Sequence, residues 1–130
     1  MEYKKYFAFH NGEYLPIGTA LYRRLVLKDG PMDELRITRE LMIRMQDLPF
    51  ERDRKFFGDG SDKKYISMTY DEFRAAWMSL LSYKNYLIEK KMKPEYEWAH
   101  IIFCKLLSAK WKRDRVWEKP IMKKELERER

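Results

Sequence analysis

The sequence predicts an α+β domain in which an N-terminal β-hairpin is followed by three to four helices, dominated by a C-terminal antiparallel helix pair. Three observations predict this class. The first residues are aromatic and β-prone around an Asn-Gly pair, later segments carry apolar residues at helical spacing, and a short proline-containing link joins the last two of these segments. A chain of 130 residues, 45% of them hydrophobic, has the size and apolar content of a single domain with one core.

Residues 1–30 are expected to hold the hairpin and one further short segment. Asn11 and Gly12 lie between two apolar runs, Tyr3 to Phe9 and Tyr14 to Ile17. Asn-Gly is the strongest short hairpin signal, because both central positions of a type I′ turn take positive φ. Pro16 has no N–H to donate to a ladder, so the second strand is expected to be short or to lie at a sheet edge.

Two helical segments are expected before residue 49. Thr19 can cap a short helix through about Lys28, with Gly30 as its stop, and the β-branched and Leu content leaves a strand open at the same place. Pro31 suits the first turn of a longer helix over residues 31–48. The apolar residues of that helix fall on one face, which predicts a surface helix that buries one stripe: Ile37, Leu41, Met45 and Leu48.

Residues 49–68 are expected to form a loop or a second small hairpin. The stretch is charged, and Gly58 and Gly60 mark a turn near its centre. Such a turn could join the strand residues Phe56-Phe57 to Tyr65-Ile66.

Residues 69–119 are expected to form the antiparallel helix pair, Tyr70 to Met92 and Glu95 to Trp117. Thr69 and Glu72 have the spacing of a capping box, in which each side chain satisfies a backbone amide at the start of the helix. The apolar stripe of the second helix ends near Lys110, so this helix is expected to project beyond the core. Residues 120–130 are a charged tail.

The charge is positive and uneven. Lys and Arg total 28 against 21 Asp and Glu, a net charge of +7. Residues 1–66 hold 13 cations and 11 anions (+2), and residues 67–130 hold 15 and 10 (+5). A basic balance favours a polyanion such as nucleic acid as partner, or serves solubility alone.

A cationic row on the last predicted helix suggests where nucleic acid would bind. Lys105, Ser108, Lys112 and Arg115 follow three- and four-residue spacing, and Trp111 lies beside them. Cations can follow phosphates while an aromatic ring stacks on a base. The alternative is a solvated face with one exposed aromatic, or a homodimer contact. The residues expected to bind DNA or RNA are Lys105, Lys110, Trp111, Lys112, Arg113 and Arg115.

Lys84 falls within the apolar arc of the first helix of the pair. Three interpretations stay open: the ammonium reaches the edge of the core, it pairs with Glu95 or Glu97, or this face is an interface. The last of these fits the second hypothesis for the whole protein. In that hypothesis it is a protein-binding adaptor or inhibitor, for example phage or mobile-element encoded, that engages a host protein machine.

Catalysis, metals, cofactors and membranes are not expected. No arrangement of nucleophile and base and no glycine-rich phosphate loop is present, so we expect no enzyme. His100 and Cys104 are spaced to share a helix face, but His10 is the only other histidine and a metal site needs more ligands. No apolar run reaches the roughly 18 residues of a membrane span, and no signal peptide is evident. The lone cysteine suits the cytoplasm.

Overall fold

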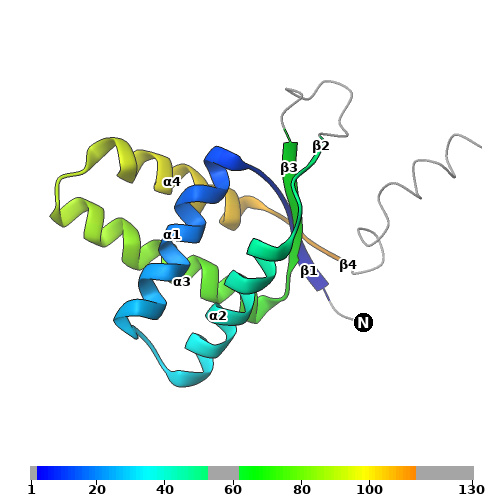
Figure 1. Cartoon of the computed structure of the whole chain (residues 1–130), viewed down its shortest axis with the longest axis horizontal. Coiled ribbons are helices and arrows are strands. Elements are labelled where there is room, and N and C mark those ends of the chain that lie inside the picture. Colours follow the sequence, from blue (N-terminus) through cyan, green and yellow to red (C-terminus); the bar gives the residue numbers. More distant parts are fainter. Residues whose placement is uncertain (1–2, 53–61, 114–130) are drawn as a thin grey trace, which may run out of the picture.

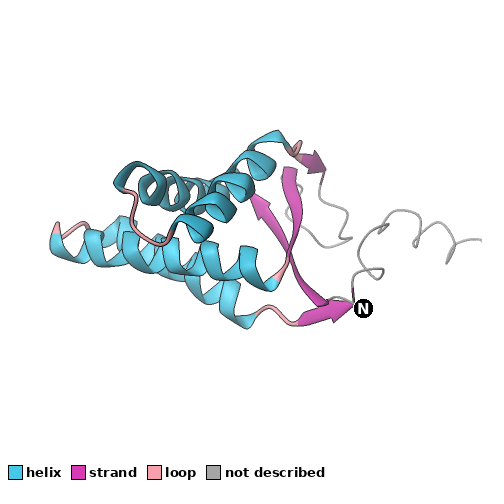
Figure 2. Ribbon diagram, turned by 90° about the horizontal axis from the view of Figure 1, so that it is seen from below, coloured by secondary structure: helices cyan, strands magenta, loops and turns pink. Residues whose placement is uncertain are grey.

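The computed structural model describes residues 3–52 and 62–113 of the chain. In these residues the helices gather on one side of a four-stranded antiparallel sheet (Figures 1 and 2), which confirms the α+β class. The elements in chain order are β1 (Tyr3–His10), α1 (Asn11–Leu27), α2 (Met32–Asp47), β2 (Glu51–Arg52), β3 (Asp62–Met68), α3 (Tyr70–Glu89), α4 (Lys93–Ser108) and β4 (Trp111–Arg113).

The sheet has the strand order β2-β3-β1-β4, so the N-terminal strand lies inside it. β1 pairs with β3 along most of its length, with Phe7 opposite Ile66, and with β4 at its beginning, with Lys5 opposite Trp111. Burial alternates along β1 and β3, which is the pattern of strands with one face against a core.

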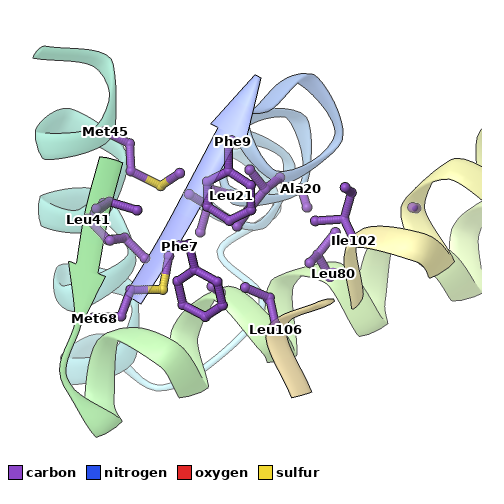
Figure 3. Close-up of a cluster of buried hydrophobic side chains, with 14 of the residues drawn as sticks. Phe7, Phe9, Ala20, Leu21, Leu41, Met45, Met68, Leu80, Ile102 and Leu106 are labelled. Carbon is purple, nitrogen blue, oxygen red and sulfur yellow. The ribbon is translucent and has the colours of Figure 1, made fainter. Parts of the chain in front are cut away.

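The core lies between the inner face of the sheet and the helices (Figure 3). β1 and β3 contribute Phe7, Phe9 and Met68, and each helix contributes the apolar residues of one stripe. The largest of the helical residues in this cluster are Ile17, Leu21, Leu41, Met45, Leu80, Leu87, Ile102 and Leu106.

The predicted hairpin at Asn11-Gly12 is wrong, because α1 begins there. His10 is the N-cap: its Nδ1 accepts a hydrogen bond from the Glu13 backbone N–H at 3.3 Å, and the Glu13 carboxylate accepts one from the His10 N–H at 3.2 Å. This reciprocal cap satisfies two amides of the first turn. It stabilises a helix where the Asn-Gly pair alone favours a turn.

Pro16 lies inside α1 and not in a strand. A residue at this position would donate its N–H to the carbonyl of Gly12, four residues earlier, and proline has no N–H to give. The indole Nε1 of Trp98, in α4, donates to that Gly12 oxygen at 2.8 Å. The helix therefore tolerates its proline, and the same hydrogen bond ties α4 to the beginning of α1.

The first helix begins earlier than predicted and ends at the predicted residue, Lys28. α1 runs through Thr19, which is no cap, and ends at Lys28 in the left-handed conformation (φ 53°). The predicted stop at Gly30 comes after this cap: Gly30 has φ 147°, and a Cβ there would lie 2.7 Å from the Arg24 guanidinium, so the turn that follows the helix requires a glycine. The predicted helix over residues 31–48 is confirmed as α2, with Pro31 as its N-cap.

The stretch between α2 and α3 contains a strand pair. β2 pairs with the beginning of β3, with Glu51 opposite Lys63. Phe56-Phe57 and the glycines of the predicted turn lie outside the described residues. The main partner of β3 is β1, more than fifty residues earlier in the chain, which sequence reasoning did not predict.

The helix pair exists, but its second member is shorter than predicted. The capping box of Thr69 and Glu72 is confirmed at the beginning of α3. α4 ends at Ser108, the backbone is extended at Ala109, and β4 follows, so the predicted helix through Trp117 and its projecting arm are wrong. The strand conformation brings Trp111 against α3 and pairs its backbone with β1. Residues 114–130, including Arg115 and the predicted tail, lie outside the described residues.

Over the part of the chain that the structure describes, no helix combines the length and the apolar character needed to cross a membrane.

Candidate nucleic-acid interface

Lys105 does not belong to an exposed cationic row. Its Nζ donates to the Glu13 carboxylate at 2.8 Å and to the Ala8 backbone carbonyl at 2.7 Å, and it lies 4.9 Å from the Phe9 ring centroid. The lysine therefore holds α4 to the segment where β1 passes into α1.

Glu13 is held ionised by this arrangement. Burial by itself would raise the pKa of the Glu13 carboxyl, but the hydrogen bond and charge of Lys105, helped by His10, lower that pKa below its ordinary value. The Glu13 carboxylate thus caps the beginning of α1 and also pairs with Lys105 in α4.

Trp111 faces the helices and not the solvent side of the sheet. Its ring lies edge-on to Phe73 at 5.7 Å and tilted against Tyr70 at 6.1 Å. Lys5 Nζ lies 4.0 Å from the Phe73 centroid and 5.2 Å from the Trp111 centroid. Trp111 is thereby separated from Lys112, its neighbour in the chain, because successive strand residues point to opposite faces.

Two lysines on the inner face of the sheet bind the ends of helices. Lys5 Nζ donates to the carbonyls of Leu106 and Leu107 in the last turn of α4, at 2.9 and 3.2 Å. Lys64 Nζ donates at 2.7 Å to the carbonyl of Met45 in the last turn of α2. A helix C-terminus carries unsatisfied carbonyls and partial negative charge, which an ammonium complements.

Both ammonium groups lie close to aromatic rings and are shielded from water. Lys64 Nζ is 4.3 Å from the Tyr14 centroid and 5.0 Å from that of Phe50. Burial lowers the pKa of Lys5 and of Lys64. Sequence reasoning missed these roles; the signal available to it was a lysine in phase with the apolar residues of each strand.

The opposite face of the sheet carries a different set of side chains. The alternation along β1 and β3, together with the strand register, places eight residues of the sheet on the side away from the helices. We call this set the outer sheet face. Its members are partly or fully exposed, and no described helix covers them (Figure 2). They are Glu51 of β2, Lys63, Tyr65 and Ser67 of β3, Lys4, Tyr6 and Ala8 of β1, and Lys112 of β4.

The outer sheet face is predominantly basic. Lys4 and Lys112 are direct partners on neighbouring strands, so two positive side chains lie side by side. Lys63 lies at the other end of the face, opposite His10 on β1 and opposite Glu51 on β2. Like charges directly opposite one another on neighbouring strands are destabilising.

The six residues expected to bind nucleic acid are thus dispersed. Lys112 is on the outer sheet face, and Lys110 is exposed next to the inward-facing Trp111. Arg113 pairs with Tyr3 through its backbone in β4, and Arg115 lies outside the described residues. The residues that sequence reasoning missed, Lys4 and Lys63 among them, could have been found only from the pairing of β1 with β3 and β4.

Lys84 neither reaches the edge of the core nor ends on a glutamate. Its side chain is buried, and its Nζ lies 2.8 Å from His100 Nδ1 and 3.9 Å from the Phe103 centroid. Burial lowers the pKa of Lys84 below its ordinary value, and the nearby Cys104 offsets only part of this effect. His100 therefore occupies the place in which a carboxylate was expected.

His100 and Cys104 contact one another, as their spacing predicts. Cys104 Sγ lies 3.5 Å from His100 Nε2. Within residues 3–52 and 62–113, no three His, Cys, Asp or Glu side chains converge in a way that could hold a metal ion. The cluster is a polar contact between α3 and α4.

No family model, curated protein or solved structure matches this chain significantly.

Proposed function

We propose that this protein is a non-catalytic nucleic-acid-binding protein that acts through its outer sheet face. Cations and aromatic rings on one accessible surface are the usual composition of a site for a phosphate backbone with bases. The proposal keeps the partner expected from the basic composition and moves the binding surface from α4 to the sheet. It places the protein in the cytoplasm, which suits its single cysteine.

The observation that carries the proposal is the pairing of Lys4 with Lys112 across β1 and β4, with Lys63 at the other end of the same face. Side-by-side cations cost stability unless they serve another purpose. Phosphate groups bind to clustered cations of this kind, and each contact releases counterions from the nucleic acid.

The test is a salt titration of binding to DNA and RNA oligonucleotides of mixed sequence, single-stranded and duplex, with wild type and a triple variant Lys4→Gln, Lys63→Gln and Lys112→Gln. Each lost phosphate contact makes the slope of log affinity against log salt shallower by roughly 0.7 to 0.9. We therefore expect the slope to change by about 2, and the affinity at 0.1 M salt to fall on the order of 100-fold.

A matched control removes the same charge elsewhere. Lys90, Lys91 and Lys93 are exposed at the turn between α3 and α4, at the end of the molecule away from the sheet (Figure 1). Their triple exchange to Gln should leave the slope nearly unchanged. Equal losses in the two variants would mean that net charge alone drives binding and would contradict the assignment of the site.

A second candidate, a protein-binding adaptor or inhibitor, is favoured by a different surface. Leu15, Tyr22 and Val26 lie along one side of α1 and are each at least 60% exposed. Exposed apolar residues at helical spacing are typical of a helix that binds another protein. Exchange of Tyr22 and Val26 for Ser should abolish capture of such a partner from nuclease-treated extract and leave nucleic-acid binding intact.

A further inference from the structure

We infer that a second copy of this chain covers the exposed apolar side of α1, so that two copies form a dimer through an antiparallel pair of α1 helices. The inference goes beyond the proposed function, because it concerns the helical side of the molecule and not the outer sheet face (Figure 2). It also commits the side of α1 that favours the second candidate function to one occupant.

Four residues on this side of α1 are spaced for packing against another helix. We call them the α1 stripe: Leu15, Thr19, Tyr22 and Val26. They follow one another at intervals of four, three and four residues, which is the spacing of the seam between two packed helices. Leu15 is 66% exposed, Tyr22 62% and Val26 60%, and Thr19 is exposed as well. Within the described part of the chain, no element covers this seam.

The α1 stripe is complementary to itself under a twofold rotation. When two α1 helices run antiparallel, with the axis midway between Thr19 and Tyr22, Leu15 meets Val26 of the second copy and Thr19 meets Tyr22 of the second copy. One register therefore makes every contact of the stripe twice, as a symmetric dimer requires. The antiparallel direction also sets the positive N-terminus of each helix beside the negative C-terminus of the other.

Gly18 gives the largest side chain of the stripe a place to enter. In a packed helix pair, each side chain enters a hole between four residues of the facing helix. The hole that receives Tyr22 consists of Leu15, Gly18, Thr19 and Tyr22 of the second copy, and its glycine and threonine leave room for the ring.

A single copy has no need of a glycine at residue 18. Its φ is not positive, and a Cβ there would lie 3.6 Å from the Tyr14 ring, which is an ordinary contact. Glycine inside a helix costs stability relative to alanine. The second copy supplies the reason for this residue that the isolated fold does not.

Charge also favours this part of the surface for contact between copies. Each copy carries a net charge of +7, so its basic faces repel one another. Over the length of α1, the arc within about 60° of Leu15 contains no charged residue. Arg23 is the nearest cation and is directed to α3, where it donates to Ser82 Oγ at 3.0 Å and lies 4.5 Å from the Tyr86 ring centroid. An uncharged stripe fits an uncharged stripe.

The area of the α1 stripe sets the strength of the dimer. At the exposed fractions given above, the stripe offers roughly 250–300 Å² of apolar surface per copy. Since about 60% of an interface is apolar, two copies bury roughly 800–1,000 Å² in total. This is the lower limit for a specific interface, so we expect a reversible dimer with a dissociation constant in the micromolar range.

The experiment is sedimentation velocity of the nuclease-treated full chain at protein concentrations from about 1 to 300 µM in about 0.5 M salt, which screens contacts between charges. We expect wild type to pass from monomer to dimer over this range. Tyr22→Ser removes the central anchor from both copies and should raise the dissociation constant about 30-fold or more.

Two further variants separate loss of the dimer from loss of the fold. Gly18→Gln fills the hole and should also abolish the dimer, although glutamine favours the helix itself. Ile88→Ser is the control, since Ile88 is 56% exposed at the other end of the helical region, on α3, and should leave the dissociation constant unchanged. Thermal unfolding of each variant identifies any that is misfolded.

Crosslinking tests the direction of the helices in a Cys104→Ser background. A short bis-maleimide should join Leu15→Cys chains to Val26→Cys chains when the two are mixed. Leu15→Cys chains alone should not crosslink, because the antiparallel register separates the two copies of residue 15 by about 16 Å along the helix.

The outcomes are distinct. A chain that stays monomeric throughout, a dimer unaffected by Tyr22→Ser and Gly18→Gln, or a Leu15→Cys chain that crosslinks to itself would each overturn the inference. A monomeric chain that captures a different protein through the stripe does the same and supports the second candidate function. No nucleic acid takes part, so failure here leaves the proposed function standing.

Discussion

At the scale of single residues, three lysines bind segments that are distant in the sequence, and the sequence predicted none of these contacts. Long charged side chains are rarely buried unless they are paired. Lys105 was expected on a basic surface, and no role was predicted for Lys5 or Lys64. In the structure their ammonium groups bind carbonyls or a carboxylate that come from distant segments. Only the packing of those segments reveals the partners.

The ion pair of Glu13 with Lys105 predicts a pH-dependent stability. Because the pKa of Glu13 is lowered in the folded protein, its ionised form contributes stability that is complete above the ordinary pKa of 4.5 and is lost as the pH falls through the folded-state pKa. Glu13→Gln should lower the free energy of unfolding by about 1–3 kcal/mol at neutral pH. Urea unfolding should show this difference shrinking on acidification below 4.5.

Glu40→Gln is the control for that measurement. Glu40 pairs with Arg36 across one helical turn at 3.2 Å, and both side chains are largely exposed. Exposed pairs of this kind contribute about 0.3–0.5 kcal/mol. A pH-independent difference for Glu13→Gln, or one as small as that of the control, would contradict the role given to Glu13.

At the scale of elements, the sequence predicted the beginning of a helix correctly where a common capping residue or a proline marks it. Thr69 with Glu72 predicted the beginning of α3, and Pro31 that of α2. The Asn11-Gly12 signal failed because His10 and Glu13 form a cap that includes a histidine, an uncommon capping residue. The end of α4 was missed because its cause is the pairing of β4 with β1, which begins more than one hundred residues earlier.

The contact between α1 and α4 predicts an energetic coupling between Pro16 and Trp98. Trp98→Phe removes the indole N–H and leaves the Gly12 carbonyl without its donor, which should cost about 1 kcal/mol of stability. In a Pro16→Ala background the alanine N–H can donate to that carbonyl instead. The cost of Trp98→Phe should then largely disappear.

A double-mutant cycle by urea denaturation measures this coupling, since the volume lost at Pro16 cancels between the two backgrounds. The same cost of Trp98→Phe with proline or alanine at residue 16 would show that the indole hydrogen bond does not compensate for the proline.

The contact between β3 and α2 predicts that Lys64 stabilises the end of a helix to which it is not connected locally. Lys64→Met keeps most of the apolar stem but leaves the Met45 carbonyl without its ammonium donor. The free energy of unfolding should fall by about 1–3 kcal/mol, and amide hydrogen exchange should rise first in the last turn of α2. Lys90→Met, at the exposed turn between α3 and α4, should change stability by less than about 0.5 kcal/mol.

At the scale of the whole molecule, the sheet is assembled from segments that are remote in the sequence. β1 pairs with β3 and β4, so the N-terminal strand holds together two regions that follow the first and the second helix pair. This arrangement separates the lysines of the sheet into two sets, one on each face. One faces the helices and stabilises them, and the other faces outward and forms the proposed binding surface.

The sequence by itself determined the α+β class, the positions of α2 and α3, and the excess of positive charge. Each of these depends on composition, on periodicity or on caps formed by residues within a few positions of one another. The tertiary structure alone decided which lysines are buried, where α4 ends and which side chains share the outer sheet face. Those features depend on strand register, because a shift of one residue exchanges the two faces of a strand, and register is set by contacts between distant segments.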